Sequence, residues 1–523
     1  MLVAIVLAAL TLLPYAETGF TTNDDTRLAL VTDPFESGWQ AAKSAGRLLH
    51  AVGGVIAYVP YLVDDNLYYQ TIRLGSLAVS VFLFGFVVFR LFRSFRLGLL
   101  AVVFFFAFLT NSWQHNLITS YPFVYSVGIC AFLVSLLSFH RFLSKPTWRL
   151  GVATGATYLV ALFISEIFVL YLIVFFALGL SVRPIEWSPR PRIIYRKLAL
   201  MVPPVATALL FVVVYFSFRL VYPATYEGIE VAGGGQVDRI LSVVWRYSLS
   251  AFPGHFPFSG IHDGLVSTSA RGGGPFVTLV AELRVVWVVK ALLVAVAVAA
   301  ALKSRARLFV GRPWMGGLSL GAVLIFLPNL LVAMSPKYQR WVAEGSQAYT
   351  TTHFSFFAVT LFLAILMIGA VRALESRKAL QRLTKGALLS ATVLMSLVTD
   401  AHNHIVTEDQ VRSQAKWRLM DAFIRTPEFK AIADGSVIVA PSLWKFHGIV
   451  ENHETYWTDY LYRKTGKKIL VRSGAQKSEP PRTGATYFLK YEERPVIEDS
   501  SISIVRVNDE KGVVEGFTAP QTK

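Results

Sequence analysis

Cysteine is nearly absent from this chain of 523 residues, which contains a single one, Cys130. A disulfide framework needs pairs of cysteines, and thiolate-bound zinc or iron–sulfur clusters need several at set spacings. These classes of protein are therefore excluded. Cys130 lies in an apolar run, and we interpret it as a packing residue.

Charge is also scarce. Only 16% of the residues are charged, whereas 54% are hydrophobic and the mean hydropathy is +0.51. This composition excludes an ordinary soluble globular protein and a disordered chain, and it places the protein in a membrane. Glycine-rich phosphate-binding motifs are missing as well, since no Gly-x-Gly-x-x-Gly opens a helix and no Walker loop is present.

Apolar runs suited to crossing a membrane recur along the chain. A span of the hydrocarbon core takes roughly 20 helical residues. Eleven candidate runs fall near 1–16, 71–89, 97–111, 121–139, 150–165, 167–182, 198–220, 284–302, 315–334, 353–371 and 386–400. The first is short, and we favour a short or truncated helix over a signal peptide that ends near Tyr15-Ala16-Glu17. The sequence from 150 to 182 is interrupted only at Ser165-Glu166, which predicts a helical hairpin that turns there.

Basic residues gather in alternate loops between these runs. Five short loops hold 20 of the 50 lysines and arginines but only two acidic residues, Glu186 and Glu375. The positive-inside rule makes these loops cytoplasmic and the N-terminus internal. The net charge of +17 is therefore an orientation signal, and we expect no nucleic-acid partner.

The opposite loops, which contain more acidic than basic residues in 15–70 and 221–283, then face outward. We predict an all-α polytopic bundle over 1–400, with outer loops 17–70, 221–283 and 335–352, and a small extracytoplasmic α/β domain over 401–523. In that domain we expect helices at 407–426 and 453–463 and strands at 436–440, 468–471, 486–490 and 502–507. Trp39, Lys43 and Arg47 belong to an amphipathic pattern that predicts an interfacial helix over 40–50.

The first outer loop carries the most informative motif, Asn23-Asp24-Asp25. A carboxylate at the membrane surface can deprotonate an acceptor hydroxyl as a general base, and a neighbouring one can orient it or hold a divalent cation. The alternative is structural, because Asn-Asp-Asp is also common at turns and helix starts.

This layout resembles the GT-C superfamily of membrane glycosyltransferases. A short first helix, an acidic pair just outside it, Gly46-Arg47 before an interfacial helix, about eleven spans and an outer C-terminal domain carry the resemblance. The chain is most similar to the bacterial GtrII-type O-antigen glucosyltransferases, in which Asn-Asp-Asp follows the first span. That branch often has Gln-Gly-Arg where this chain has Ala45-Gly46-Arg47, so the second motif matches only in part.

The resemblance implies a polyprenyl-phosphate-linked sugar donor, a first-loop acid as catalytic base, and basic residues that hold the donor phosphate. Asp24 and Asp25 are the candidate catalytic residues, supported by Asn23 and Arg47. The outward candidates for phosphate binding are Lys337, Arg340, Arg246 and Arg271, with His255 and His262 as supporting residues. Headgroup anchoring is the alternative for Lys337 and Arg340. We assign no metal ligand, although Mg²⁺ or Mn²⁺ is compatible with the acidic pair.

A few other polar groups stand out. Lys290 lies inside the eighth predicted span, and Glu166 lies at the turn of the predicted hairpin. These two residues are either functional or a structural pair with each other. Arg73 and Arg219 lie at outer ends of spans, where snorkelling to headgroups is the simplest explanation. His402-x-His404 has the spacing of a strand-borne metal pair, without supporting carboxylates. The aromatic run 456–462 fits sugar stacking, but we favour a helix face packed on a sheet.

We therefore expect an inverting glycosyltransferase of the cytoplasmic membrane. It would move a sugar from a lipid phosphate to a hydroxyl of a polysaccharide, lipid or protein acceptor on the outer side. The alternatives are a polysaccharide or lipid flippase or exporter, and a membrane O-acyltransferase or O-antigen polymerase. A flippase needs charged or broken spans along a central path, and only Lys290 lies well inside a span.

Overall fold

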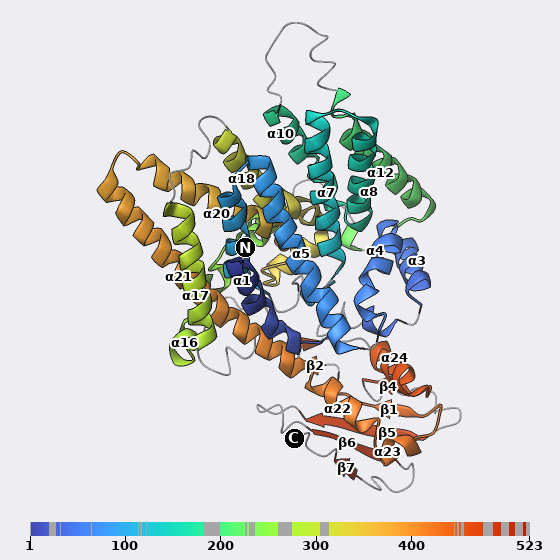
Figure 1. Cartoon of the computed structure of the whole chain (residues 1–523). Helices are drawn as coiled ribbons and strands as arrows, with labels where there is room; N and C mark the ends of the chain where they lie inside the picture. Colours follow the sequence, from blue (N-terminus) through green and yellow to red (C-terminus); the bar gives the residue numbers. More distant parts are fainter. Residues whose placement is uncertain are drawn as a thin grey trace. The chain divides into compact units, whose positions relative to one another are not determined.

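The computed structural model is predominantly helical (Figure 1). It describes residues 2–19, 28–31, 33–63, 65–112, 115, 118–121, 123–182, 199–224, 227–229, 236–259, 275–303, 313–443, 445–446, 449–450, 454–473, 485–492, 501–507 and 516–518. Asn23, Asp24, Asp25, His262 and Arg271 lie outside these residues.

The chain divides into two compact units. The first, the helical unit, comprises Met1–Ala16 and Pro34–Val406, and the second comprises Glu17–Asp33 and Thr407–Lys523. The helix α21 (Lys378–Ser413) runs through the boundary near residue 406. The segment from 17 to 33, at the start of the first predicted outer loop, thus belongs with the C-terminal unit.

Six helices of the described chain have the length and composition to cross a membrane. They are α5 (Asn66–Phe92), α7 (Val124–Ser144), α12 (Val202–Val221), α17 (Val285–Lys303), α18 (Pro313–Ala333, apolar over Gly316–Ala333) and α20 (Thr352–Ala373). Shorter apolar helices are α1 (Leu2–Leu12), α4 (Leu49–Ala57), α6 (Phe95–Phe108), α8 (Trp148–Ile164), α9 (Ile167–Leu170) and α10 (Leu172–Val182). The protein is therefore a helical, multi-pass membrane protein by its architecture.

Local sequence sets the ends of these helices. The Asp65 side chain accepts a hydrogen bond from the Tyr68 N–H at 2.7 Å and caps α5. The same helix ends at Arg93 in a left-handed conformation, and Ser94 then caps α6. These two caps produce the tight reversal between α5 and α6 that the basic residues near 90–96 mark in the sequence.

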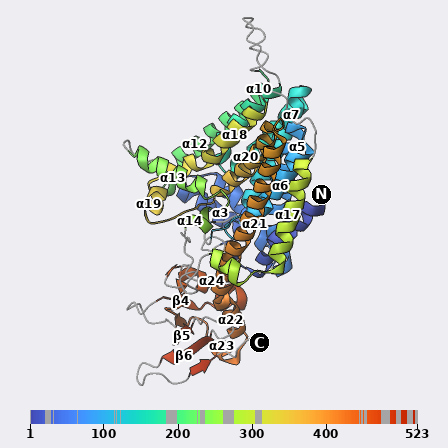
Figure 2. The same ribbon diagram turned by 90° about the vertical axis from the view of Figure 1, so that its left-hand side faces the viewer.

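The core of the helical unit lies where α6 meets α5 and α20. The side chains of Phe105 and Phe357 lie 4.7 Å apart between ring centroids, and Phe356 packs on Phe105 from the side. The helices α7 and α8 pack together as a second group, and α12 lies against α8 (Figures 1 and 2). Aromatic side chains fill the space between helices that have little polarity of their own.

Four predicted elements differ from the structure. The helix predicted over 407–426 is divided at Gln414, between the end of α21 and the separate helix α22 (Ala415–Phe423). The predicted interfacial helix over 40–50 is two helices, α3 (Pro34–Ala45) and α4 (Leu49–Ala57), because the chain turns at Gly46. The predicted hairpin turn at Ser165-Glu166 is present, but its second arm is the short α9 followed by α10. The predicted last span does not end at residue 400, because α21 continues for a further 13 residues to Ser413 without a break.

The second unit contains a five-stranded sheet in the order β4-β1-β5-β6-β7. β1 (Val437–Val439) pairs in parallel with β4 (Leu470–Arg472) and β5 (Thr486–Glu492), whereas β6 (Ser501–Val507) and β7 (Gly516–Thr518) continue the sheet antiparallel. A separate two-stranded sheet joins β2 (Lys445–Phe446) and β3 (Ile449–Val450). The helices of this unit are α22 (Ala415–Phe423), α23 (Pro427–Ala431) and α24 (Glu454–Thr465).

The core of this second unit centres on two tryptophans. Trp417 of α22 stacks on Trp457 of α24 at 3.8 Å, and Tyr460 packs against both. Leu30, from the segment 17–33, belongs to the same apolar cluster. Trp457 and Tyr460 therefore have a packing role, as the helix-face interpretation of residues 456–462 predicts.

Candidate functional site

The helices α3 and α4 form a hairpin whose turn depends on Gly46. This glycine has φ +59°, and a Cβ atom added there would lie 2.7 Å from the carbonyl oxygen of Tyr222. The Arg47 N–H donates to the carbonyl of Ala42 at 2.9 Å, which closes the turn. Only glycine fits both the backbone conformation and the close approach. The Gly46-Arg47 pair is thus a tight turn that projects an arginine.

The Arg47 guanidinium forms an ion pair with Glu166 at the start of α9. Both side chains are mostly buried, with exposed fractions of 18% and 25%. Burial is the largest influence and lowers the pKa of Arg47, but Glu166 and three nearby tyrosines together outweigh it, and the pKa is raised. The remaining contributions come from Tyr215, Tyr338 and Tyr349, which places these phenols within electrostatic reach of the arginine.

A second group of residues lies on α13 (Val237–Leu249), α19 (Pro336–Ala343) and the loop that follows α19 (Figure 2). Tyr247, Tyr338 and Val342 form a small apolar cluster between the two helices. The Tyr338 hydroxyl donates to that of Tyr349 at 3.0 Å. This arrangement joins the predicted outer loops 221–283 and 335–352.

The predicted phosphate-binding residues of this group already have partners. Arg246 donates from Nη1 to the carbonyl of Val342 at 3.0 Å. Arg340 pairs with Glu227 at 2.9 Å, and both side chains are more than half exposed. Lys337 Nζ lies 4.6 Å from the centre of the Trp341 ring. The three cations are close together in the fold, and each of them already contacts a carbonyl, a carboxylate or an aromatic ring.

His255 lies in the short helix α14 (His255–Ser259). Burial lowers its pKa, as does the charge of Arg246, while a hydrogen bond with Gln347 opposes the shift. The imidazole is therefore mainly neutral at pH 7 and can accept or donate a proton through its ring nitrogens. Gln347 belongs to the loop after α19, so His255 borders the same group of residues.

Of the predicted site residues, the structure brings Arg246, Lys337 and Arg340 together on α13 and α19. His255 lies near Arg246, and Arg47 lies near Tyr338 and Tyr349 of the same group. For Asn23, Asp24, Asp25, His262 and Arg271 the assignments stay predictions. A structural pair of Glu166 with Lys290 was one of the two interpretations of these residues, and this one is wrong, because Glu166 pairs with Arg47 and Lys290 with Asp400. A pairing of residues 119 positions apart leaves no pattern in the sequence.

Lys290 instead pairs with Asp400 of α21, at 2.5 Å from Nζ to Oδ1. The two side chains are 2% and 10% exposed, so this pair of charges is neutralised inside the bundle. Asp400 lies at the end of an apolar run, and we interpreted it as the boundary of the last predicted span. The feature of the sequence that could have indicated a buried role is the polar group His402-Asn403-His404, which begins two residues later.

Arg73 also differs from its predicted role. Its side chain is 1% exposed and donates to the carbonyl of Tyr15 and to Oε1 of Gln70, both at 2.5 Å. An arginine that is enclosed in this way does not snorkel to headgroups. Its position fixes the end of α1 against α5.

The histidines 402 and 404 are not a strand-borne metal pair, because both lie on helix α21. Residues two apart on a helix point about 200° apart around the axis. His402 contacts the carbonyl of Asn111 through Nε2 at 2.9 Å, and His404 faces Arg284 instead, at 2.7 Å. Each imidazole thus has a separate environment.

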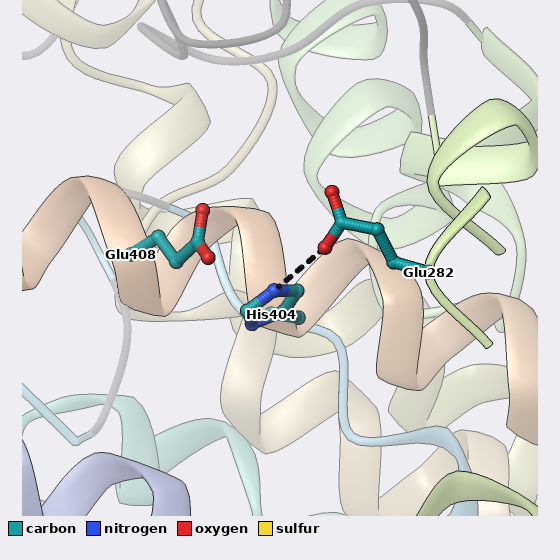
Figure 3. A group of neighbouring side chains, drawn as sticks. All are labelled: Glu282, His404 and Glu408. Atoms are coloured by element: carbon teal, nitrogen blue, oxygen red, sulfur yellow. Dashed lines mark ion pairs between the residues drawn. The ribbon is translucent and has the colours of Figure 1, made fainter. Parts of the chain in front are cut away.

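Glu282 and His404 form an ion pair at 3.4 Å, and Glu408 lies one turn further along α21 (Figure 3). Imidazole and carboxylate groups of this kind are able to hold a divalent metal ion. Arg284, however, places its Nη2 against the same Nε2 atom of His404. A metal bound through that nitrogen has to displace a guanidinium, so this cluster does not carry the assignment of the site.

No protein-family model and no curated protein matches this chain.

Proposed function

We propose that the protein is a GT-C-type glycosyltransferase of the cytoplasmic membrane. It moves a sugar from a polyprenyl-phosphate donor to a hydroxyl of a glycan, lipid or protein acceptor on the outer side. In this proposal the six candidate spans, together with α1, α6, α8, the α9–α10 arm and the apolar part of α21, make eleven crossings. The N-terminus is inside, and the C-terminal unit is outside.

One observation carries the proposal: residues from three predicted outer loops come together. Arg47 belongs to the first, Arg246 and His255 to the second, and Lys337 to the third. Tyr338 and Tyr349 lie near enough to Arg47 to influence its pKa, and Arg246 bonds to Val342, so the three segments lie in one region. A lipid-linked phosphate at the membrane surface needs fixed positive charge of this kind, because it is partly desolvated there.

The reaction requires a base for the acceptor. The acceptor oxygen attacks the anomeric carbon of the sugar, the bond from that carbon to the phosphate oxygen breaks, and the hydroxyl proton passes to a carboxylate. We assign this base to Asp24, with Asp25 holding the loop or a cation. Arg246, Lys337, Arg340 and Arg271 face the donor phosphate, and the leaving phosphate retains the electron pair of the broken bond.

A flippase or exporter is less well supported. Such a protein needs charges along a path through the spans, and Lys290, the cation deepest in a predicted span, is neutralised by Asp400. No observation favours an acyltransferase or a polymerase over the glycosyltransferase.

The test is sugar transfer from labelled polyprenyl-phosphate sugars by purified protein. Asp24→Asn and Asp25→Asn are made separately, and the variant that removes the base is expected to lose about 10²–10⁴ of rate at normal membrane abundance. Asp65→Asn is the matched control, because Asp65 caps α5 in the same loop and Asn caps equally well. If Asp24→Asn and Asp25→Asn both transfer sugar within about threefold of the parent, the acidic pair is a turn and the proposal fails.

A further inference from the structure

We propose that Glu166 is a positioning residue that orients the Arg47 guanidinium toward an anionic oxygen of the ligand, the phosphate of a prenyl-phosphate lipid. This inference rests on the proposed function, since it names the residues that would recognise its donor. It assigns the phosphate contact primarily to Arg47, ahead of the cations of α13 and α19.

The guanidinium of Arg47 has one edge engaged and another available. Its Nη2 donates to Oε1 of Glu166. Its Nε is fully enclosed and has no hydrogen-bond partner among the described residues. A buried N–H without an acceptor is unfavourable, and arginine is suited to binding two oxygen groups on different edges. In the proposal, a phosphate oxygen is the acceptor that this N–H lacks.

The position of the Arg47 guanidinium is fixed by its backbone and by its ion pair. Gly46 brings the turn against Tyr222 and cannot be replaced without moving the hairpin. Trp39 of α3 packs on Phe218 and Tyr222 of the neighbouring α12 region. Glu166 holds the far end of the side chain from the corner between α8 and α9. The arginine is therefore held rigidly, with few rotamers to lose when a ligand binds.

The local charge suits an anion. Tyr215 interacts electrostatically with both members of the pair and forms a hydrogen bond with Arg219. Arg47, Arg219 and Glu166 therefore lie near the same phenol, and these three side chains together carry one excess positive charge. The phenols of Tyr338 and Tyr349 lie within electrostatic reach of Arg47, and their mutual hydrogen bond uses the proton of Tyr338 and not that of Tyr349, which can donate to a phosphate oxygen.

The other candidate cations are less suitable as the main contact. Arg340 is exposed and paired with Glu227, where water screens its charge. Arg246 supports the backbone of α19 through Val342. Lys337 lies over an aromatic ring. Among these residues, Arg47 is the one that combines burial with an unfilled donor.

The experiment measures binding of three lipids to the purified full-length protein in nanodiscs, namely polyprenyl phosphate, the uncharged polyprenol and phosphatidylglycerol. We expect Glu166→Gln to weaken polyprenyl phosphate binding about tenfold, since a small displacement of a positioned group has effects of that size or larger. Polyprenol binding stays unchanged. Glu166→Asp restores part of the affinity, and Arg47→Ala loses at least as much as Glu166→Gln.

Glu36→Gln is the matched control. It makes the same substitution at an exposed residue of the α3–α4 hairpin that carries Arg47, where Glu36 accepts a hydrogen bond from Gln40, and we expect no change in binding. Melting temperatures of all variants separate a loss of folded protein from a loss of affinity, because a merely structural role lowers binding of all three lipids together.

Three results overturn the inference. If Arg47→Ala binds polyprenyl phosphate within about threefold of the parent, then Arg47 is not the phosphate contact. If Glu166→Gln binds as tightly as the parent, or more tightly, then Glu166 does not position the arginine or it competes with the phosphate. If phosphatidylglycerol binds as well as polyprenyl phosphate, the site is a general headgroup site. If the expected binding pattern is seen without sugar transfer, the inference stands and the proposed function fails.

Discussion

Buried charges in the helical unit meet partners that are far away in the sequence. Lys290 and Asp400 are 110 positions apart, and Arg47 and Glu166 are 119 apart. Each of these groups is costly in an apolar surrounding unless it is paired. Removal of one member leaves the charge of the other without compensation, whereas removal of both costs much less.

This asymmetry makes the first prediction. We expect Lys290→Met to lower the free energy of unfolding by about 3–5 kcal/mol, because the enclosed Asp400 carboxylate loses its counter-ion. The double variant Lys290→Met/Asp400→Leu recovers most of that loss. Melting temperatures in one detergent compare the three proteins. A double variant as unstable as the single one would show that the pair has a further role.

His255 gives a prediction on pH. Its pKa is lower in the folded protein than in the unfolded chain because burial disfavours the imidazolium. The unfolded chain then binds more protons below the ordinary histidine pKa of about 6.5, so stability is fully present above that pH and is lost as the pH falls toward the folded value. When the pH is lowered from 7.5 to 5.5, we expect the melting temperature of His255→Gln to fall by less than that of the parent. Parallel profiles would contradict this account.

Among the elements, the α3–α4 hairpin depends on a single backbone conformation. Gly46 combines a positive φ with a contact distance that a side chain cannot occupy. We expect Gly46→Ala to destabilise the hairpin by about 1–3 kcal/mol or more and to displace Arg47. Limited proteolysis within 34–57 measures the effect.

Gly75 is the control for this substitution. It lies inside α5, and an added Cβ there meets nothing within 4 Å. Alanine favours a helix over glycine by roughly 0.5–1 kcal/mol, so Gly75→Ala is expected to preserve or raise stability. Equal proteolysis of the Gly46→Ala and Gly75→Ala proteins would remove the argument that the turn requires glycine.

The helix α21 shows why an element can differ from its prediction. Its polarity changes near Asp400, and a change in composition suggested that the helix ended there. In the fold, Asn403 accepts a hydrogen bond from the Asn111 N–H and donates one to the carbonyl of Leu109, and His402 contacts the Asn111 carbonyl. Polar residues of the helix thus supply hydrogen-bond partners to backbone groups of residues 109–111, which are buried, so the helix continues through these polar residues.

For the whole molecule, the orientation is the main quantity to test. The basic loops predict that the end of α17 is cytoplasmic and that the C-terminal unit is external. We expect alkaline phosphatase fused at Gly435 or Lys464 to be active, and fused after Lys303 to be inactive. The reverse pattern would mean that the protein has the opposite orientation in the membrane. Activity at all three positions would mean that the number of spans between Lys303 and Gly435 is wrong.

Much of the architecture could be predicted from the sequence, because apolar length and period-2 alternation act locally. The apolar runs lead to α5, α7, α12, α17, α18 and α20, and β1, β4, β5 and β6 fall on predicted strands. The candidate site was predictable only as a set of residue types in outer loops. Its pairings were not, since Arg47 was assigned to substrate or loop support without a partner, and Lys290 was the one partner considered for Glu166.

The sequence by itself determined that this is a multi-pass helical membrane protein whose basic residues are concentrated in alternate segments between its apolar runs, since hydrophobic length and charge distribution are properties of the chain. Only the tertiary structure decided which charges meet. Whether Arg47 reaches Glu166, and whether Asp400 reaches Lys290, depends on how helices pack, and packing joins residues more than a hundred positions apart. A charge inside the bundle requires a partner, but the chain alone does not specify which one.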